Sequence, residues 1–278
     1  MGLLYDRKYS VEIISDFDNI IFDDIQMVFD ISKMLTKTPD SGSIQLYNLT
    51  AGNDILFNWN QKKAKVVLKC GYRDLTPDII FSGEVVKYER VYDETDVISV
   101  LTLGDGYEAL TKVNLNKSYK SGMNAATIIE DVIKSVKAAG VEITGDIKKK
   151  IAEIKAENKK VDSGLSISGL LSSTLETLLK PFNKTITIQD DVLKIVEIGK
   201  EEVTGKYTIL TPESGLIGSP SKTKDGLEFV ALIQPGKFNP GQFVEIKSRD
   251  FDGRYKIVKS NFVGDTHGND WYVRGLCI

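Results

Sequence analysis

The stretch Gly264–Asp270 reads GDTHGND and contains the only histidine of the 278 residues. Asp265 and His267 lie two positions apart, and carboxylate and imidazole side chains can bind the metal ions that activate water for phosphoester hydrolysis. A two-metal centre of that kind needs further His, Asp and Asn ligands from several strand ends. The sequence has no second histidine and no motif of the GNHE kind to supply them.

The same seven residues lie between two runs of alternating polarity, around Tyr255 and after Trp271. Gly, Asp and Asn gather in hairpin loops because they tolerate positive φ or hydrogen-bond their own backbone. We therefore predict a hairpin turn, although GDxHG is also a spelling found in metallophosphoesterases. A metal-dependent hydrolase centred on His267 is the less favoured alternative.

No other catalytic arrangement is evident. A Ser-His-Asp or Cys-His set would depend on His267, and the sequence has no Gly-x-Ser-x-Gly elbow and no GxxxxGK or GxGxxG loop. Adjacent acids such as Asp23 with Asp24 and Asp190 with Asp191 are typical of solvent-facing turns. We predict a protein that is not an enzyme, with no catalytic, cofactor-binding or metal-binding residues and no cofactor.

Composition places the chain among soluble globular proteins, with 41% hydrophobic and 27% charged residues. The net charge of −3 gives no general attraction to nucleic acid or to an anionic membrane. No apolar run of about 18 residues could span a bilayer, and Met1 to Tyr9 lacks the apolar core of a signal peptide, so we expect a cytosolic product. Cys70 and Cys277 lie in strand-like runs, and two buried thiols are favoured over a disulfide.

Residues 1–111 have the period-two alternation of half-buried strands. Apolar and polar side chains alternate from Ile25 through Met27 and Phe29 to Ile31. Further strands are expected at 43–49, 63–72, 79–91 and 96–105.

Residues 112–202 change to helical spacing. One helix is predicted over 124–140, with Asn124 as its N-cap and Gly140 at its end, and a second over 166–181, stopped by Pro181. Ile167 and Leu170 belong to the apolar face predicted for the second helix.

Between these helices, the lysine-rich stretch from Lys148 to Lys160 also contains Glu153 and Glu157 and has no aromatic residue. A solvated helix or loop is therefore favoured over a nucleic-acid site. A hairpin is predicted over 185–199, turning at Asp190 and Asp191.

Strand-like patterns return in residues 203–278, at 226–233, 241–251, 253–265 and 270–278. They repeat the layout of the first region, because VVLKC before FSGEVVKYERV matches FVEIKS before FDGRYKIVKSNFV. Each copy has Phe-x-Gly at the start of a long arm, at Phe81 and Gly83 and at Phe251 and Gly253. We predict a mainly β fold: two related antiparallel β-barrel domains, 1–111 and 203–278, joined by an α+β insert of two helices and a hairpin, 112–202.

The C-terminal third, residues 214–248 followed by 251–277, resembles the hub proteins of contractile phage tail baseplates and their tailocin and prophage relatives. The N-terminal run SVEIISDFDNIIFDD and the later GSIQLYNLT also resemble that family. The insert matches only in outline.

The resemblance implies a homotrimer in which two tube-like barrels per chain give a pseudo-sixfold ring within the virion. The implied partners are the tail tube protein, central spike protein, baseplate wedge proteins and tape measure protein, with DNA only in transit and no membrane insertion. The long arms 79–103 and 254–277 are candidate ring-forming surfaces, and the turn acids Asp93, Glu94 and Asp96 could line the channel. A tube adaptor or plug is a competing hypothesis, and so is a peptidoglycan-binding module built on the middle helices and hairpin 185–198.

Overall fold

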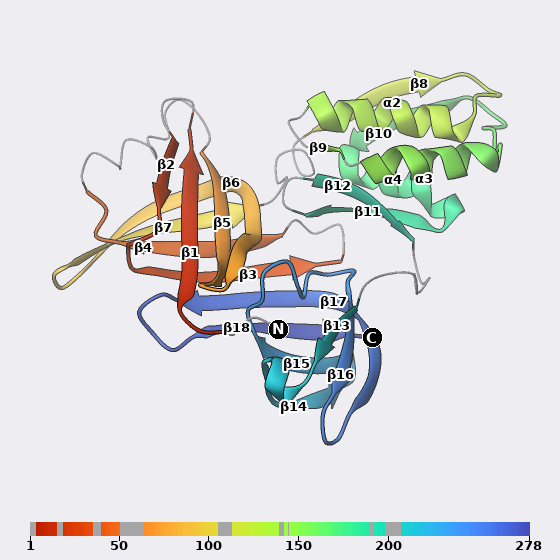
Figure 1. The fold of residues 1–278 in the computed structure, drawn as a ribbon. Coiled ribbons are helices and arrows are strands. Elements are labelled where there is room, and N and C mark those ends of the chain that lie inside the picture. Colours follow the sequence, from red (N-terminus) through yellow and green to blue (C-terminus); the bar gives the residue numbers. More distant parts are fainter. Residues whose placement is uncertain are drawn as a thin grey trace. The chain divides into compact units, whose positions relative to one another are not determined.

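A computed structural model of the chain describes residues 4–15, 19–35, 40–50, 64–104, 113–138, 142–143, 145–189, 192–197 and 207–278 (Figure 1). These residues form two compact units. The β-unit comprises the described residues of Met1–Leu35, Asp40–Gly104 and Glu201–Ile278, and the insert unit those of Asp105–Lys200. No helix in the described part is long and apolar enough to cross a membrane.

The β-unit has one 13-stranded sheet in two modules. The strands of the N-module are β1 (Arg7–Ile14), β2 (Asn19–Phe22), β3 (Met27–Met34), β4 (Ser41–Tyr47), β5 (Lys65–Tyr72), β6 (Leu75–Asp93) and β7 (Asp96–Gly104). Those of the C-module are β13 (Tyr207–Leu210), β14 (Leu216–Thr223), β15 (Gly226–Leu232), β16 (Phe243–Lys247), β17 (Asp252–Asp265) and β18 (Trp271–Cys277). The strands predicted from period-two alternation are confirmed, whereas β1, β2, β13 and β14 were not located from periodicity.

The two modules have the same strand order. In the N-module it is β1-β5-β6-β7-β4-β3, with β2 beyond β1, and in the C-module it is β13-β16-β17-β18-β15-β14. After its first strand or strands, each module has a hairpin, β3–β4 or β14–β15, followed by a three-stranded meander, β5–β6–β7 or β16–β17–β18. The last strand of the meander pairs with the second strand of the hairpin. The edge strands differ in direction, since β1 runs antiparallel to β5 and β13 runs parallel to β16.

A bulge marks equivalent positions in the two long strands. The register against the next strand shifts between Val85 and Lys87 in β6 and between Ile257 and Lys259 in β17. With the bulges aligned, Phe81 corresponds to Gly253, so the two Phe-x-Gly spellings are displaced by two positions. The predicted repeat of layout is present in the strand order, but the particular residues chosen to mark it are not equivalent, because a bulge resets the register that sequence spacing counts.

The modules share a sheet and a hydrophobic core. β3 pairs antiparallel with β17, and the orange β3 arrow lies beside the blue β17 arrow in Figure 1. One cluster of buried side chains contains residues of both modules, including Phe29 and Phe81 of the first and Phe229 and Trp271 of the second. The mainly β, antiparallel fold class is confirmed, while no closed barrel is found among the described strands. The predicted boundaries at 111/112 and 202/203 lie outside the described residues.

The insert unit packs helices against two small sheets. Its elements are β8 (Asn114–Tyr119), α2 (Ala125–Ala138), β9 (Glu142–Ile143), α3 (Gly145–Ala156), β10 (Leu165–Leu170), α4 (Leu171–Leu179), the 3₁₀ turn η2 (Lys180–Phe182), β11 (Lys184–Gln189) and β12 (Val192–Glu197). β8 pairs with β10, and β11-β12-β9 form the second sheet. Helix α2 packs on α3 and α4, and α4 also contacts β10 and β11.

The predicted cap of α2 is confirmed, because the Asn124 side-chain oxygen accepts a hydrogen bond from the Ala126 N–H at 2.8 Å. Gly140, Asp190 and Asp191 lie outside the described residues, although β11 and β12 form the predicted hairpin. The lysine-rich stretch is mostly α3, whose Ile147, Ile151 and Ile154 are buried.

The second predicted helix is wrong in its first part. Residues 165–170 form β10, which pairs with β8 from Leu165 opposite Tyr119 to Leu170 opposite Asn114. Gly169 has a φ of +144°, which is incompatible with an α-helix, and the helix begins only at Leu171. Ile167 is buried from a strand instead, because alternating and helical spacing coincide over a run this short.

Cys70 and Cys277 are free and buried, as predicted. Burial raises the pKa of Cys277 to about 12 and that of Cys70 well above its ordinary value. We expect neither thiol to react with Ellman's reagent at pH 8 in the folded protein, because the reactive thiolate is absent and the sulfurs are inaccessible. Two equivalents should react in guanidinium. Rapid labelling of folded protein would contradict this packing.

Candidate functional site

The joint between the two modules is the candidate functional site. Strand β17 is long enough to pair twice along one edge, first with β16 through Asp252–Lys256 and then with β3 through Lys259–Asp265. The β3 ladder runs from Lys259 opposite Met34 to Asp265 opposite Val28. The joint is thus built from segments more than 220 positions apart in the sequence.

The GDTHGND loop connects β17 to β18 and is the predicted hairpin turn. The Asp265 carboxylate accepts hydrogen bonds from the backbone N–H groups of His267 at 2.9 Å and Gly268 at 2.8 Å. The Asp265 N–H donates to the carbonyl oxygen of Asp270 at 2.7 Å. The aspartate that could have been a metal ligand therefore holds the shape of the turn.

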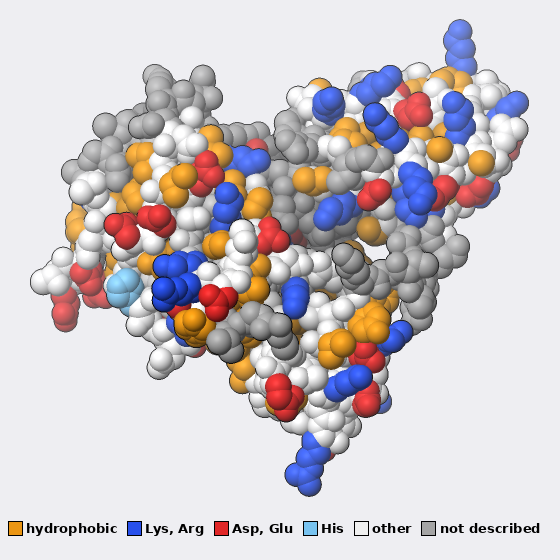
Figure 2. Space-filling view, viewed as in Figure 1, with side chains coloured by type: hydrophobic (Ala, Val, Ile, Leu, Met, Phe, Trp, Pro, Cys, Tyr) orange, Lys and Arg blue, Asp and Glu red, His pale blue; other side chains and the backbone are white. Residues whose placement is uncertain are grey.

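His267 is exposed and is the pale blue group in Figure 2. Its Nδ1 lies 3.1 Å from the Thr266 hydroxyl, and no metal-binding group of three or more His, Cys, Asp and Glu side chains occurs among the described residues. The structure therefore brings no further ligand set to this histidine within the part of the chain it describes.

The loop fastens the C-module to the N-module through Thr266. The Thr266 N–H donates to the Met27 carbonyl oxygen at 2.9 Å, and the Thr266 hydroxyl accepts from the Met27 N–H at 2.9 Å. These bonds extend the β3–β17 ladder by one residue into the loop. Thr266, rather than the histidine beside it, is the side chain of this motif that joins the modules.

Arg7 of β1 clamps the same loop from the N-module. Its guanidinium donates to the carbonyl oxygens of Asp265 at 3.1 Å, Gly268 at 2.8 Å and Asn269 at 3.1 Å. It also lies over the Trp271 ring, 5.2 Å from the ring centroid. A planar group with five fixed donors suits such a cluster of carbonyls, and an ammonium does not. Sequence reasoning missed Arg7, because nothing near position 7 signals partners some 260 residues away.

An aromatic contact fills the joint from the core side. Phe29 of β3 meets Trp271 edge to face, with ring centroids 5.6 Å apart and planes inclined by 74°. Gly264 pairs with Phe29 across the ladder, and a Cβ at Gly264 would overlap the Phe29 ring. A glycine is therefore required here to admit the large side chain of β3.

The opposite face of the joint is open and polar. Asn261 donates to the Asp30 carboxylate at 2.6 Å, which links β17 to β3. A groove of about 520 Å³ runs over this face, and its charged lining residues are Asp30, Asp225, Glu228, Lys259 and Arg274. Both signs of charge alternate there, and acidic and basic side chains are also interspersed on the face seen in Figure 2. Such a surface does not concentrate one sign of potential.

The turn acids predicted to line a channel are at the β6–β7 turn, where Glu94 adopts a φ of +50° and Asp96 accepts a hydrogen bond from the Asn48 side chain at 2.9 Å. The structure does not bring them together with the module joint. Asp23 and Asp24 are exposed, as expected of turn residues.

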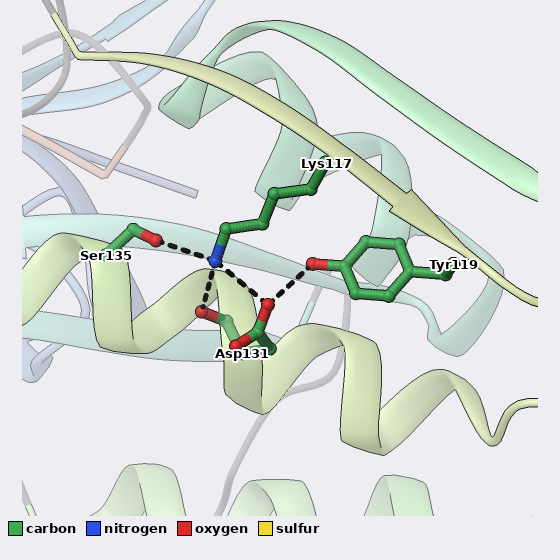
Figure 3. Close-up of polar contacts among 4 residues, drawn as sticks. All are labelled: Lys117, Tyr119, Asp131 and Ser135. Carbon is green, nitrogen blue, oxygen red and sulfur yellow. Dashed lines mark hydrogen bonds and ion pairs between the residues drawn. The ribbon is translucent and has the colours of Figure 1, made fainter.

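A second polar cluster lies in the insert unit, between β8 and α2 (Figure 3). The Lys117 ammonium donates to the Asp131 carboxylate at 2.8 Å and to the Ser135 hydroxyl at 3.1 Å. The Tyr119 hydroxyl donates to the same carboxylate at 2.8 Å. The hydrogen bonds from Lys117 and Tyr119 lower the pKa of Asp131, while burial and the Asp131 hydrogen bond raise that of Tyr119 to about 12. The cluster fixes strand β8 to helix α2.

A family model described as Baseplate hub gp41 matches residues 9–277. No curated protein matches the chain. Among solved structures, the fold is similar to that of the tail protein from Neisseria meningitidis MC58, with a TM-score of 0.66, 10% identity, and 99% of this chain and 97% of that chain covered.

The 43 kDa tail protein of prophage MuSo2 from Shewanella oneidensis is similar over 97% of both chains, with a TM-score of 0.65 and 12% identity. The Escherichia coli c3393 protein is described as a component of the type VI secretion system with structural similarity to T4 bacteriophage tail proteins gp27 and gp5. Its TM-score is 0.57 at 11% identity, with 92% of this chain and 73% of that chain covered. At identities this low, the structural similarity shows a shared fold and nothing more specific.

Replacing Arg7 by alanine should lower the free energy of unfolding of the β-unit by about 2 kcal/mol, because three carbonyl oxygens lose a charged donor. Arg7→Lys should recover only part of it, since a single ammonium cannot reach all three. Urea unfolding is followed by Trp271 fluorescence in a Trp59→Phe background. Arg73→Ala is the matched control, because its 66%-exposed side chain pairs only weakly with Asp6 at 3.7 Å. Equal effects of both alanine variants would contradict the clamp.

Replacing Asp131 by asparagine should destabilise the insert unit at pH 7 by about 0.5 kcal/mol, the size expected of a half-exposed ion pair. The pKa of Asp131 in the folded protein lies below the ordinary carboxyl value of 3.8. The ion pair therefore stabilises the folded state above pH 3.8, and this stabilisation is lost as the pH falls through the folded-state pKa. Circular dichroism at 222 nm follows the insert unit, which contains every α-helix described. Glu130→Gln, on the same helix, should show no such difference. A difference that persisted unchanged at pH 2 would disprove the assignment.

Proposed function

The chain belongs to the Baseplate hub gp41 family, and we propose that it forms the trimeric hub ring that joins the sixfold tail tube to the threefold spike of a contractile phage-like tail. The observation that supports this most directly is the repeated module. Two modules with one strand order in each chain give six equivalent modules in three chains, which suits a component lying between sixfold and threefold partners. The phage tail baseplate is the site of action that the family implies.

The module joint supports a rigid role in that ring. A ladder of seven paired residues, the Thr266 bonds and the Arg7 clamp hold the two modules in one fixed arrangement, as a ring segment under load requires. We propose residues 1–111 and 203–278 as the two tube-like domains, with 112–202 as an α+β insert domain. The partners proposed are the tail tube, central spike, wedge and tape measure proteins.

The open face of the sheet supports passage of DNA through the ring. Its acidic and basic side chains alternate across strands, with Asp30 and Glu228 against Lys259 and Arg274, so a duplex passing it would meet no continuous positive surface. We propose that this face lines the channel, with Asp93, Glu94 and Asp96 near one rim, and that the protein acts without catalysis.

Light scattering coupled to size exclusion tests the ring. The chain mass of 30.9 kDa predicts a species of about 93 kDa, three times that value. Negative-stain averages should show a ring with a central hole and a pseudo-sixfold outline. A protein that remains a monomer, alone and when its spike partner is added, would remove the hub role and favour a tube adaptor or plug.

A further inference from the structure

The insert unit contains a groove between strand β10 and helix α4, with a volume of about 230 Å³. Four residues of β10 and four of α4 line it, and none of these side chains is charged. Five of the eight bear hydroxyl groups, and the other three are Leu165, Ile167 and Leu178. The groove is therefore neutral, partly apolar and rich in hydrogen-bonding groups.

One edge of β10 faces this groove. Within the described residues, β10 pairs with β8 alone. The Leu171 N–H donates to the Val113 carbonyl oxygen at 2.9 Å, which continues the β8–β10 register by one residue. Because the backbone bonds of an antiparallel ladder involve every second residue, Ser166 and Ser168 direct their N–H and C=O groups away from β8.

Two side-chain contacts agree with this backbone direction. The Ser173 hydroxyl donates to the Leu170 carbonyl oxygen at 3.0 Å, so that carbonyl points toward α4. The Ser118 and Ser166 hydroxyls lie 2.9 Å apart, a close approach typical of a pair that exchanges no backbone bonds. No backbone hydrogen bond of Ser166 or Ser168 is found in the described part of the chain. The two serines therefore present two N–H and two C=O groups to the groove.

A buried hydroxyl group on the helix side also lacks a partner. Thr174 of α4 lines the groove and is only 8% exposed. No hydrogen bond of its hydroxyl is found among the residues that the structure describes. Buried polar groups are normally hydrogen-bonded, so a polar atom of a bound segment would complete this one.

The chemistry of the groove selects an extended and uncharged ligand. An exposed strand edge binds an extended peptide through main-chain hydrogen bonds, and the side chains beside it set the specificity. A charged side chain would lose its hydration in a groove that offers no opposite charge. Leu165 and Leu178 favour an apolar side chain, and the hydroxyl groups favour a neutral polar one.

We propose that the groove between β10 and α4 is a docking site for an extended, uncharged segment of a partner protein. The segment adds to β10 as the third strand of the β8–β10 sheet, and its backbone pairs with Ser166 and Ser168. An apolar side chain lies on Leu165 and Leu178, and a polar side chain bonds the Thr174 hydroxyl. The site lies within the insert unit and does not depend on the proposed hub ring.

The probe is a peptide of alternating threonine and valine, acetylated and amidated so that it carries no charge. Added at millimolar concentration to the full-length, isotope-labelled protein, it should shift the amide signals of Ser166 and Ser168 in a saturable way. Hydrogen exchange of these two amides should become slower, because both N–H groups gain acceptors. The same peptide with glutamate or lysine in place of threonine should bind about tenfold more weakly, since its charges lose hydration in the groove.

Two variants of the helix test the position of the peptide. Thr177→Trp, at an exposed position of α4, should fill the groove and abolish binding. Thr127→Trp is the matched control, because Thr127 is an exposed threonine of α2 and does not line the groove. Thr174→Val should weaken binding about fivefold, the value of one neutral hydrogen bond. Circular dichroism of all three variants should match that of the unmodified chain.

Three results would overturn the docking site. The first is an absence of amide shifts at Ser166 and Ser168 with the neutral peptide. The second is equal binding of the neutral and charged peptides. The third is an equal response of Thr177→Trp and Thr127→Trp. The oligomeric state of the chain is measured separately, so a failure of the proposed ring would leave this groove standing, and the reverse also holds.

Discussion

The pairing of β3 with β17 is the interaction on which the β-unit depends. A strand edge presents a row of N–H and C=O groups, and each such row must be paired, covered or left to water. Strand β17 extends beyond the end of β16, and the extending part pairs with β3, which comes from the other end of the sequence. Both modules contribute buried side chains to one hydrophobic cluster, so the ladder also holds the core residues of one module against those of the other.

The rest of the joint follows from that ladder. Once β3 lies on β17, Phe29 has to pass the position of residue 264, which only glycine permits, and the chain must turn immediately afterwards to return as β18. The Asp265 carboxylate holds the shape of this turn by accepting backbone hydrogen bonds, and the Arg7 guanidinium donates to carbonyl oxygens of the turn. A motif whose sequence resembles a metal-binding one thus shapes the backbone of a turn, and its histidine is exposed.

The similarity to solved structures is a similarity of backbone fold rather than of side chains. Tail proteins from two bacterial sources share this fold across nearly the whole chain at 10% and 12% identity, so the fold tolerates almost complete replacement of its side chains. Strand order is a backbone property and does not require particular side chains at most positions. In the insert unit, by contrast, α2 and α4 bury apolar faces of their own and form a separate core.

The sequence by itself determined the local elements whose signals are short-range. Alternating apolar and polar residues predicted β3 from Met27 to Ile31, and these apolar residues are buried in the structure. Asn124 marked the start of α2, and glycine, aspartate and asparagine marked the turn at 264–270. It also suggested a repeat, which is present in the common strand order of the modules, although the residues chosen to mark it are not equivalent. Only the tertiary structure decided that β3 pairs with β17 rather than closing its own module, that Arg7 binds a loop some 260 residues away, and that Ile167 belongs to a strand. The reason is physical: propensity and periodicity are set by neighbours along the chain, whereas the choice of an edge partner depends on which backbone groups remain unpaired once all the other strands are in place.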